Sequence, residues 1–473
     1  MTARVTTGLR LVQLIASRPD PTEPAPVGFL AAAMSASLSG TSRLCAELEH
    51  LGLLERGEGY GAYRLGPVAI QLSGRAAAPF AKTVRFALTR AAQKTGETVC
   101  LAAPSPDGFR VVSVVDSPWT LHAPAALGEL AEDDGAIALA GQGWGVDALG
   151  AFPRAEVTSG KRVEVALPVL DPLGETVAVV AARLPVYRAK RGVPQAGSAL
   201  TTARRILERE LTAGGGAGRD EVRLPADAPV ADEARLASSL EAALRILQHL
   251  AGGADAAAGI ARATGLRLDR TRRLLESCRR SGLVTAARDG VEHRLAWVVH
   301  GWYRAAAPQT LVQRGRHFVA EAAEATGACA FLTVLKGMRS FTLVEELAVL
   351  GEGLVMRPWL GKPHPIVGSD GGPTLVMDLT PEQLAEIFPS RHTPQEFERF
   401  LDRVRRAVRD GVLALESIEE FGITSVSAPV RDASGTVAAA ACIVGATEYV
   451  KPRLGAIQAA ARQLAEQVSA LLV

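Results

Sequence analysis

The segment Thr-Gly-Glu-Thr-Val-Cys-Leu-Ala at residues 95–102 returns as Thr-Gly-Ala-Cys-Ala-Phe-Leu-Thr at residues 326–333. Two further pairs of segments surround it in the same order. They are Leu-Gly-Leu-Leu at 51–54 with Ser-Gly-Leu-Val at 281–284, and Pro-Val-Leu-Asp at 168–171 with Pro-Val-Arg-Asp at 429–432. A repeat of so long a period indicates two copies of one multidomain unit, not a solenoid of short repeats. We therefore expect one chain to carry both halves of a pseudo-dimer, an arrangement that most oligomers reach by pairing two chains.

Composition limits the classes of function. The 473 residues are 48% hydrophobic and 22% charged, with a net charge of +2, so any nucleic-acid contact must come from a local patch. Aromatic residues are only 5%, which argues against base stacking as a binding mode. No apolar run reaches the ~18 residues of a membrane span, so we expect a cytoplasmic protein. Scattered cysteines predict reduced buried thiols, with no metal site and no cofactor. These cysteines are Cys45, Cys100, Cys278, Cys329 and Cys442.

The first copy begins with a winged helix-turn-helix pattern in residues 1–75. Helical periodicity covers residues 7–17 and 27–34, and a third helix ends at His50 before Gly52. Residues 53–56 and 62–65, joined by a glycine-rich turn, predict a β-hairpin. Three short helices followed by a hairpin are the layout of a winged helix.

The second copy repeats this layout in residues 234–302. Its helices are expected at 240–250, 256–264 and 269–280. Its wing is expected at 284–287 and 292–295, joined by an Asp-Gly turn that strongly favours a hairpin.

An α+β domain with an antiparallel sheet is expected after each wing, in residues 76–213 and 303–473. Each begins with an amphipathic helix, at 80–94 and 310–325. Extended runs follow at 98–103, 110–115, 162–169 and 176–184, and again at 329–335, 340–345, 424–430 and 437–444. A Gly- and Pro-containing linker at 214–233 joins the copies. The offset between them grows from 230 (282 − 52) to 261 (429 − 168), so the first domain lacks about thirty residues that match 381–411.

These residues together resemble the IclR family of bacterial transcriptional regulators. The resemblance covers nearly the whole chain twice and rests on the order of several short segments. They are residues 240–247, 260–266, 63–66, 326–327 and 428–435. It implies a winged helix joined to a GAF-like effector domain in each copy. The chain departs from the family in residues 364–372, which replace a Leu-Pro-Leu-His-Ala-Thr-like segment, and at Ser425, which replaces a cysteine.

DNA reading needs donors near the start of a groove-binding helix and cations for phosphates. The helix at 269–280 is rich in arginine, whereas its counterpart in the first copy is polar but nearly uncharged. The first helix could read bases or serve only in pairing, and the second could be a solvated basic face. We predict more phosphate contacts from the second copy. The expected DNA contacts are Arg267, Arg270, Thr271, Arg272, Arg273, Arg288 and Arg294 in the second copy, and Ser39, Thr41, Ser42, Arg43, Arg56 and Arg64 in the first.

An effector pocket is expected in the second domain, between the sheet and a short helix after Gly368. A few polar groups among apolar walls suit a small metabolite. The alternatives are that the polar pair at the helix start only caps the helix, and that the serines and the cysteine lie in the core. The expected lining residues are Met356, Trp359, Ser369, Asp370, Ser425, Ser427 and Cys442.

The sequence therefore predicts a one-component regulator that binds a DNA operator and a small-molecule effector, with self-association of the two halves. The alternative is a ligand-sensing or protein-interaction protein that has lost DNA binding. An enzyme is not expected, because the chain has no nucleophile elbow, no phosphate-binding loop and no recognisable triad.

Overall fold

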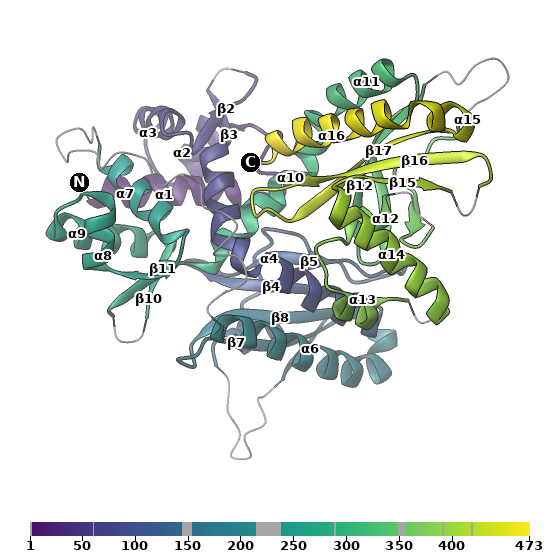
Figure 1. Ribbon diagram of the computed structural model, residues 1–473. Coiled ribbons are helices and arrows are strands. Elements are labelled where there is room, and N and C mark those ends of the chain that lie inside the picture. Colours follow the sequence, from purple (N-terminus) through teal and green to yellow (C-terminus); the bar gives the residue numbers. More distant parts are fainter. Residues whose placement is uncertain are drawn as a thin grey trace. The chain divides into compact units, whose positions relative to one another are not determined.

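Two compact units, residues 1–306 and 307–473, make up the chain (Figure 1). The computed structural model describes residues 2–59, 61–143, 154–213, 238–287, 290–348, 356–368, 371–389, 392–417 and 420–473. In these ranges no helix is long and apolar enough to cross a membrane.

Unit 1 begins with three helices and a small antiparallel sheet, here named module 1. The helices are α1 (Thr2–Ala16), α2 (Val27–Ala33) and α3 (Leu38–His50). The strands, in the order β1-β3-β2, are β1 (Ala25–Pro26), β3 (Ala62–Leu65) and β2 (Leu54–Arg56). Ser37 caps α3 by accepting the Gly40 N–H at 3.2 Å, and Gly52 ends it with a φ of +69°.

Module 2, residues 238–295, has the same order of elements. Its helices are α7 (Ser239–Leu250), α8 (Ala257–Thr264) and α9 (Leu268–Arg280). Its strands, in the order β10-β11-β9, are β10 (Val284–Ala286), β11 (Glu292–Leu295) and β9 (Asp255–Ala256). The hydroxyl of Ser238 caps α7 through the Glu241 N–H at 3.1 Å.

The two modules pack on each other within unit 1. The Thr6 hydroxyl of α1 donates to the Ser277 carbonyl of α9 at 3.2 Å, and Arg10 donates to the Arg280 carbonyl at 3.1 Å. A Cβ at Gly8 would lie 2.9 Å from a methyl group of Leu240, so α1 and α7 approach closely. The amino-terminal helix of module 1 therefore holds the carboxyl-terminal half of α9.

Sheet domain 1 lies between the modules in the sequence. Its strands, in the order β5-β4-β8-β7-β6, are β5 (Gly108–Val115), β4 (Thr98–Ser105), β8 (Thr176–Pro185), β7 (Arg162–Leu170) and β6 (Ala155–Ser159). Its helical segments are α4 (Pro67–Thr95), α5 (Ala136–Gly141), η1 (Val186–Arg188) and α6 (Ala189–Thr212). The four predicted strands are confirmed. The helix predicted from residue 80 begins earlier, because Pro79 lies inside α4 without ending it.

Two short helical segments, η3 (Trp297–Gly301) and α10 (Trp302–Gln313), follow module 2. Unit 2 then contains sheet domain 2, with the strand order β14-β13-β12-β17-β16-β15. The strands are β14 (Pro363–Pro365), β13 (Arg339–Glu346), β12 (Cys329–Lys336), β17 (Val437–Ala446), β16 (Ile423–Arg431) and β15 (Leu413–Glu416). The helical segments are α11 (Gly315–Thr326), α12 (Gly372–Leu375), α13 (Pro381–Ile387), α14 (Pro394–Asp410), α15 (Thr447–Val450), η4 (Lys451–Arg453) and α16 (Leu454–Leu471).

Alternation along the central strands gives sheet domain 2 two different faces (Figure 1). Val426, Ala428 and Ile443 pack with α11 and α16 on one face. Cys442 and Val444 pack with Leu375 of α12 on the other. The single helix predicted at 310–325 is wrong, since α10 ends before Arg314 and α11 begins after it.

Candidate functional site

The amino-terminal half of α9 presents arginines at the surface. Arg267, Arg272 and Arg273 are exposed, while Arg270 is half-buried. The later arginines of the helix differ, because Arg279 and Arg280 both bond to Glu276, at 2.9 and 2.8 Å. The exposed arginines 272 and 273 therefore lie in the half of α9 opposite to the residues that bond to α1.

Two of the predicted DNA contacts are wrong. Thr41 is 3% exposed and Thr271 is fully buried, and the Thr271 hydroxyl donates to the Arg267 carbonyl at 3.2 Å. Thr271 stands three residues before Leu274, so helical geometry places it on the buried face of α9. Neither threonine can reach a DNA base from this position.

The corresponding helix of module 1, α3, has a different surface. Ser39, Ser42 and Arg43 are exposed, and Arg43 donates to the Ser39 carbonyl at 3.3 Å. Apolar side chains lie in the same region, with Phe29 of α2 52% and Leu38 57% exposed. The surface of module 1 is therefore partly apolar where that of module 2 is cationic.

The described arginines of the small sheets, which the sequence predicted as DNA contacts, each bond to a carboxylate. Arg56 bonds to Glu49 at 2.9 Å, and Arg64 bonds to Glu55 at 2.9 Å. Arg294 of β11 bonds at 2.7 Å to Asp171, which lies in the β7–β8 turn of sheet domain 1. Arg288 lies outside the described residues.

The Asp171 carboxylate ties module 2 to sheet domain 1. Its side chain is almost fully buried and also accepts the N–H groups of Leu173 and Glu175, each at 2.9 Å. Burial acts to raise the pKa of Asp171, but the hydrogen bonds and charge of Arg294 together with these amides lower it below its usual value. The carboxylate is thus held in its charged form.

Three predicted effector residues meet on the α12 face of sheet domain 2. Ser427 shares a 2.8 Å hydrogen bond with Thr374 of α12, and Cys442 lies 3.8 Å from the Thr333 hydroxyl. Ser425 is 1% exposed, and its hydroxyl has no hydrogen-bond partner among the described residues. An unsatisfied buried hydroxyl is costly, so it indicates a place where a polar group of a ligand or a water would bind.

The structure describes only two of the four other predicted effector residues. Met356 and Trp359 pack against the apolar cluster on this same face, as expected. The Trp359 ring also contacts the His364 ring edge-on, with centroids 4.1 Å apart. Ser369 and Asp370 lie outside the described residues.

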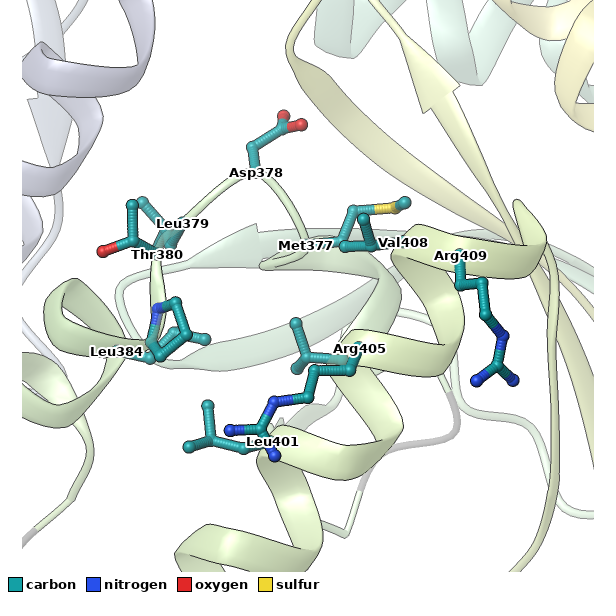
Figure 2. Close-up of a pocket in the computed structure, with 11 residues that line it drawn as sticks. Met377, Asp378, Leu379, Thr380, Leu384, Leu401, Arg405, Val408 and Arg409 are labelled. Atoms are coloured by element: carbon teal, nitrogen blue, oxygen red, sulfur yellow. The ribbon is translucent and has the colours of Figure 1, made fainter.

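A cavity of about 380 Å³ lies elsewhere in unit 2, and the sequence did not predict it. It separates the segment 377–384 from α14, and its walls are mainly apolar (Figure 2). Arg405 and Arg409 stand on α14 beside it, paired with Asp402 and Asp410. Seven of its eleven lining residues fall in the segment 381–411 that sheet domain 1 lacks. The apolar positions Leu401, Val404 and Val408, three and four apart, were the sequence signal for it.

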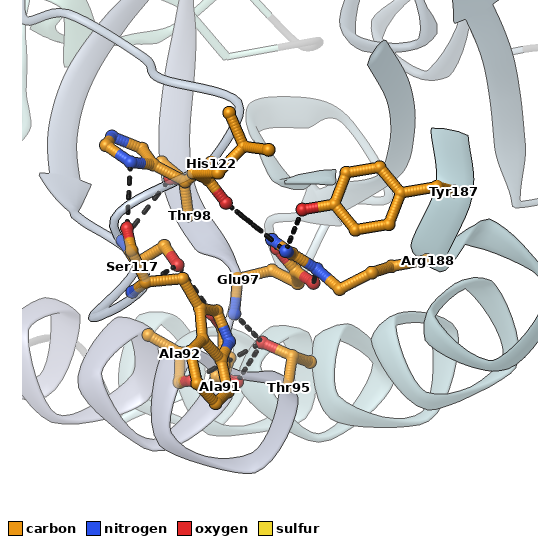
Figure 3. A network of polar contacts seen from close by, with 12 residues as sticks. Ala91, Ala92, Thr95, Glu97, Thr98, Ser117, His122, Tyr187 and Arg188 are labelled. Atoms are coloured by element: carbon orange, nitrogen blue, oxygen red, sulfur yellow. Dashed lines mark hydrogen bonds and ion pairs between the residues drawn. The ribbon is translucent and has the colours of Figure 1, made fainter. Parts of the chain in front are cut away.

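The repeated Thr-Gly segment has a structural role in each sheet domain. In domain 1, Arg188 holds Glu97 through two bonds, at 2.6 and 2.8 Å, and also donates to the Leu121 carbonyl (Figure 3). In domain 2, the Tyr449 hydroxyl donates to the Thr326 carbonyl at 2.9 Å. Both arrangements fasten the short helical segment that follows the last strand to the Thr-Gly segment at the end of the helix before the sheet. In the described ranges, no group of three or more His, Cys, Asp or Glu residues could hold a metal ion.

Comparisons with known proteins give no match among curated sequences. Solved structures with some likeness include an IclR-family transcriptional regulator from Rhodococcus sp., with 21% identity over 51% of this chain and 98% of that one, at a TM-score of 0.39. HmgR from Pseudomonas aeruginosa shows 22% identity over 50% of this chain and 97% of its own, at 0.36. An IclR homolog from Microbacterium hydrocarbonoxydans, complexed with 4-hydroxybenzoate, shows 21% identity over 50% of this chain and 99% of its own, at a TM-score of 0.31.

The match to a protein family is confined to unit 2 and the end of unit 1. Residues 304–470 match the family described as the C-terminal domain of the bacterial transcriptional regulator IclR. These residues include all of sheet domain 2. Sheet domain 2 therefore resembles the C-terminal domain of IclR regulators.

Proposed function

We propose that this chain is a DNA-binding transcriptional regulator of the IclR type. In this proposal the two halves are fused copies that act as the two protomers of a pseudo-dimer. Modules 1 and 2 are its winged helices, and the sheet domains are GAF-like effector domains. An effector bound to sheet domain 2 changes the population of module poses and so the affinity for an operator.

The observation that carries DNA binding is the surface of α9. Arg272 and Arg273 in its first half, and Arg267 just before it, are exposed, and the hydrogen bonds from α1 reach its second half. In a helix-turn-helix, the amino-terminal residues of the recognition helix contact base edges and phosphates. Arginine binds guanine edges in pairs of hydrogen bonds and also neutralises phosphates.

Support for a fused pair comes from the shared order of elements in the two modules and in the two sheets. Further support comes from the bonds of Thr6 and Arg10 to α9, because they join the modules within one unit. Two groove-reading helices held at a fixed spacing would fit two half-sites of one operator.

The effector proposal rests on the α12 face of sheet domain 2. Ser425, Ser427 and Cys442 offer hydroxyl and thiol groups there, among the apolar side chains of the same cluster. A related IclR homolog is complexed with 4-hydroxybenzoate, which makes small aromatic acids the first compounds to test. Residues 304–470 match the C-terminal domain family of IclR regulators, which supports a regulatory ligand.

The experiment is a binding titration of the full chain with DNA from upstream of its own coding sequence. Fluorescence anisotropy at several salt concentrations should give specific binding that weakens steeply as salt rises, because bound arginines displace counterions. Absence of binding even at low salt would exclude the proposal.

A second candidate is a ligand-sensing or protein-interaction protein without DNA binding. The exposed Phe29 and Leu38 of module 1 favour it, since apolar surface on a helix-turn-helix suits a protein partner better than a phosphate backbone. The same titration separates the two candidates.

A further inference from the structure

The two sheet domains can be compared residue by residue through their strand registers. Glu164 lies opposite Arg183 in the β7–β8 pair, and Ser425 lies opposite Val444 in the β16–β17 pair. Glu164 and Ser425 each stand four residues before the proline of the repeated turn (168 − 164 and 429 − 425). The pair Glu164–Arg183 in domain 1 therefore corresponds to Ser425–Val444 in domain 2.

Neighbouring positions on this face also differ between the domains. Ala166 and Ala181 of domain 1 are opposite each other in the register, as Ser427 and Cys442 are in domain 2. Small apolar side chains thus replace the hydroxyl and the thiol. The space above them in domain 1 is available to larger side chains on the neighbouring positions.

Glu164 and Arg183 fill this space with a closed set of bonds. Arg183 donates to Glu164 at 2.8 Å and to the Pro124 carbonyl at 3.0 Å, and it lies 2.7 Å from Glu129. The other Glu164 oxygen accepts the N–H of Ile137, at the start of α5, at 3.2 Å. Arg183 is 2% and Glu164 5% exposed, and both charges have partners.

The short helix above the sheet completes the correspondence. A Cβ at Gly135, just before α5, would lie 3.3 Å from a Glu164 oxygen. A Cβ at Gly371, just before α12, would lie 3.0 Å from the Cys442 sulfur. Helix α5 contacts both β7 and β8, and α12 contacts both β16 and β17, which are the corresponding strands of domain 2. In domain 1, a carboxylate of the chain itself is bonded to the short helix.

We infer that Glu164 and Arg183 are a built-in occupant of sheet domain 1. They take the place that the effector takes in sheet domain 2, so one chain binds one effector and only domain 2 responds. The inference rests on the effector site proposed above for domain 2. Domain 1 is then a fixed support, and its Asp171 in the turn between the same two strands holds Arg294 of module 2.

Thiol labelling of the full chain tests this without any effector or DNA. Cys100 is fully buried, and it packs in the same cluster as Ala166, Ala181 and Ile137, beneath the Glu164–Arg183 pair. Cys278 of module 2 is equally buried, and burial raises the pKa of each thiol to about 12. Both thiols are labelled with methyl methanethiosulfonate, and the ratio of Cys100 to Cys278 labelling is measured by peptide mass spectrometry. Global unfolding exposes both thiols alike, so a change in the ratio reports local opening around one of them.

The double variant Glu164→Ser/Arg183→Val gives domain 1 the residue types of domain 2. We expect the labelling ratio to rise by at least about tenfold, because the thiol then faces an open site. The matched control Glu164→Gln/Arg183→Met keeps the volume without charge, and its ratio should remain at the wild-type value. An unchanged ratio in a folded Ser/Val variant would overturn the inference.

The reverse exchange, Ser425→Glu/Val444→Arg, keeps the inference testable if the first variant does not fold. In the wild type we expect Cys442 to be labelled faster than Cys278, which is fully buried in a different cluster, and the exchange should remove that difference. Equal labelling of the two thiols in the wild type, or a Cys442 rate that survives the exchange, would contradict the inference. DNA titrations of the same proteins show separately whether the regulator proposal holds.

Discussion

The two halves of the chain, residues 2–213 and 238–473, differ in where they place charge. The first half buries it in sheet domain 1, in the pairs Arg183–Glu164 and Arg188–Glu97. Its helix α3 has one arginine, whereas α9 of the second half has five. The second half has a neutral sheet face of hydroxyl and thiol groups instead. The first half therefore carries a buried ion pair where the corresponding strand positions of the second half, Ser425 and Val444, are uncharged.

The largest effect should come from removing one partner of the buried pair. Arg183→Val leaves the carboxylates of Glu164 and Glu129 without their cation, so we expect a loss of about 3–5 kcal/mol in the free energy of unfolding. Urea titration of the full chain measures it. Glu164→Ser/Arg183→Val is the matched control and should lose less, because it also removes the buried anion. A loss no greater for the single variant than for the double would contradict internal charge satisfaction.

The next effect concerns His300, whose counterpart in the first half is Ile70 (300 − 282 and 70 − 52). Burial, and secondarily the charge of Arg304, lowers the pKa of His300 to about 3. In the unfolded chain this histidine binds a proton near pH 6.5. The contribution of the neutral His300 to the free energy of unfolding is therefore fully present above that pH and is lost as the pH falls toward 3. At pH 5 the loss should be about 2 kcal/mol.

His300→Ile is the matched variant for this pH effect. It should flatten the dependence of the unfolding free energy on pH between 7 and 5, since isoleucine does not titrate. Unchanged slopes in the variant would mean that another group is responsible.

A smaller effect separates the two counterpart arginines of the small sheets, Arg294 and Arg64 (294 − 282 and 64 − 52). Arg294→Ala should cost about 1.5 kcal/mol, because its partner Asp171 is buried. Arg64→Ala should cost less than about 1 kcal/mol, because its partner Glu55 is 39% exposed. The contribution of the Asp171–Arg294 pair to the free energy of unfolding is fully present above the usual carboxyl pKa. It disappears as the pH falls through the lowered pKa of Asp171. Equal costs at pH 7 would show that module 2 is not fastened to sheet domain 1.

The smallest effect tests the turn between the second and third helices of each module. Ser35 has a φ of 49° where module 2 has Gly265, with a φ of 70°. Because a side chain is strained in this left-handed conformation, Ser35→Gly should stabilise by about 1 kcal/mol and Gly265→Ser should destabilise by about as much. Melting curves of the two variants should shift in opposite directions, and shifts of the same sign would contradict the correspondence of the turns.

The sequence predicted the central strands of both sheets well, since buried strands and polar turns leave a local pattern. It also contained the signal that Thr271 is buried, because Thr271 stands three residues before the apolar Leu274 on the same helix. It could not predict that Arg294 meets Asp171, because 123 residues separate them. The pairing of Glu164 with Arg183 was likewise out of reach, since it depends on strand register.

In the proposed regulator, α9 binds DNA and α3 contributes much less. The most direct measurement compares the DNA affinity and salt dependence of Arg272→Ala/Arg273→Ala with those of Ser42→Ala/Arg43→Ala, the same two positions in module 1. If each arginine contacts a phosphate, the α9 variant should bind DNA about tenfold or more weakly than wild type. The slope of log affinity against log salt concentration should also become shallower by about two. The α3 variant should stay within about threefold of the wild-type affinity. Equal losses for the two variants would contradict the division of roles between the halves, and no loss for either would contradict DNA binding by these helices.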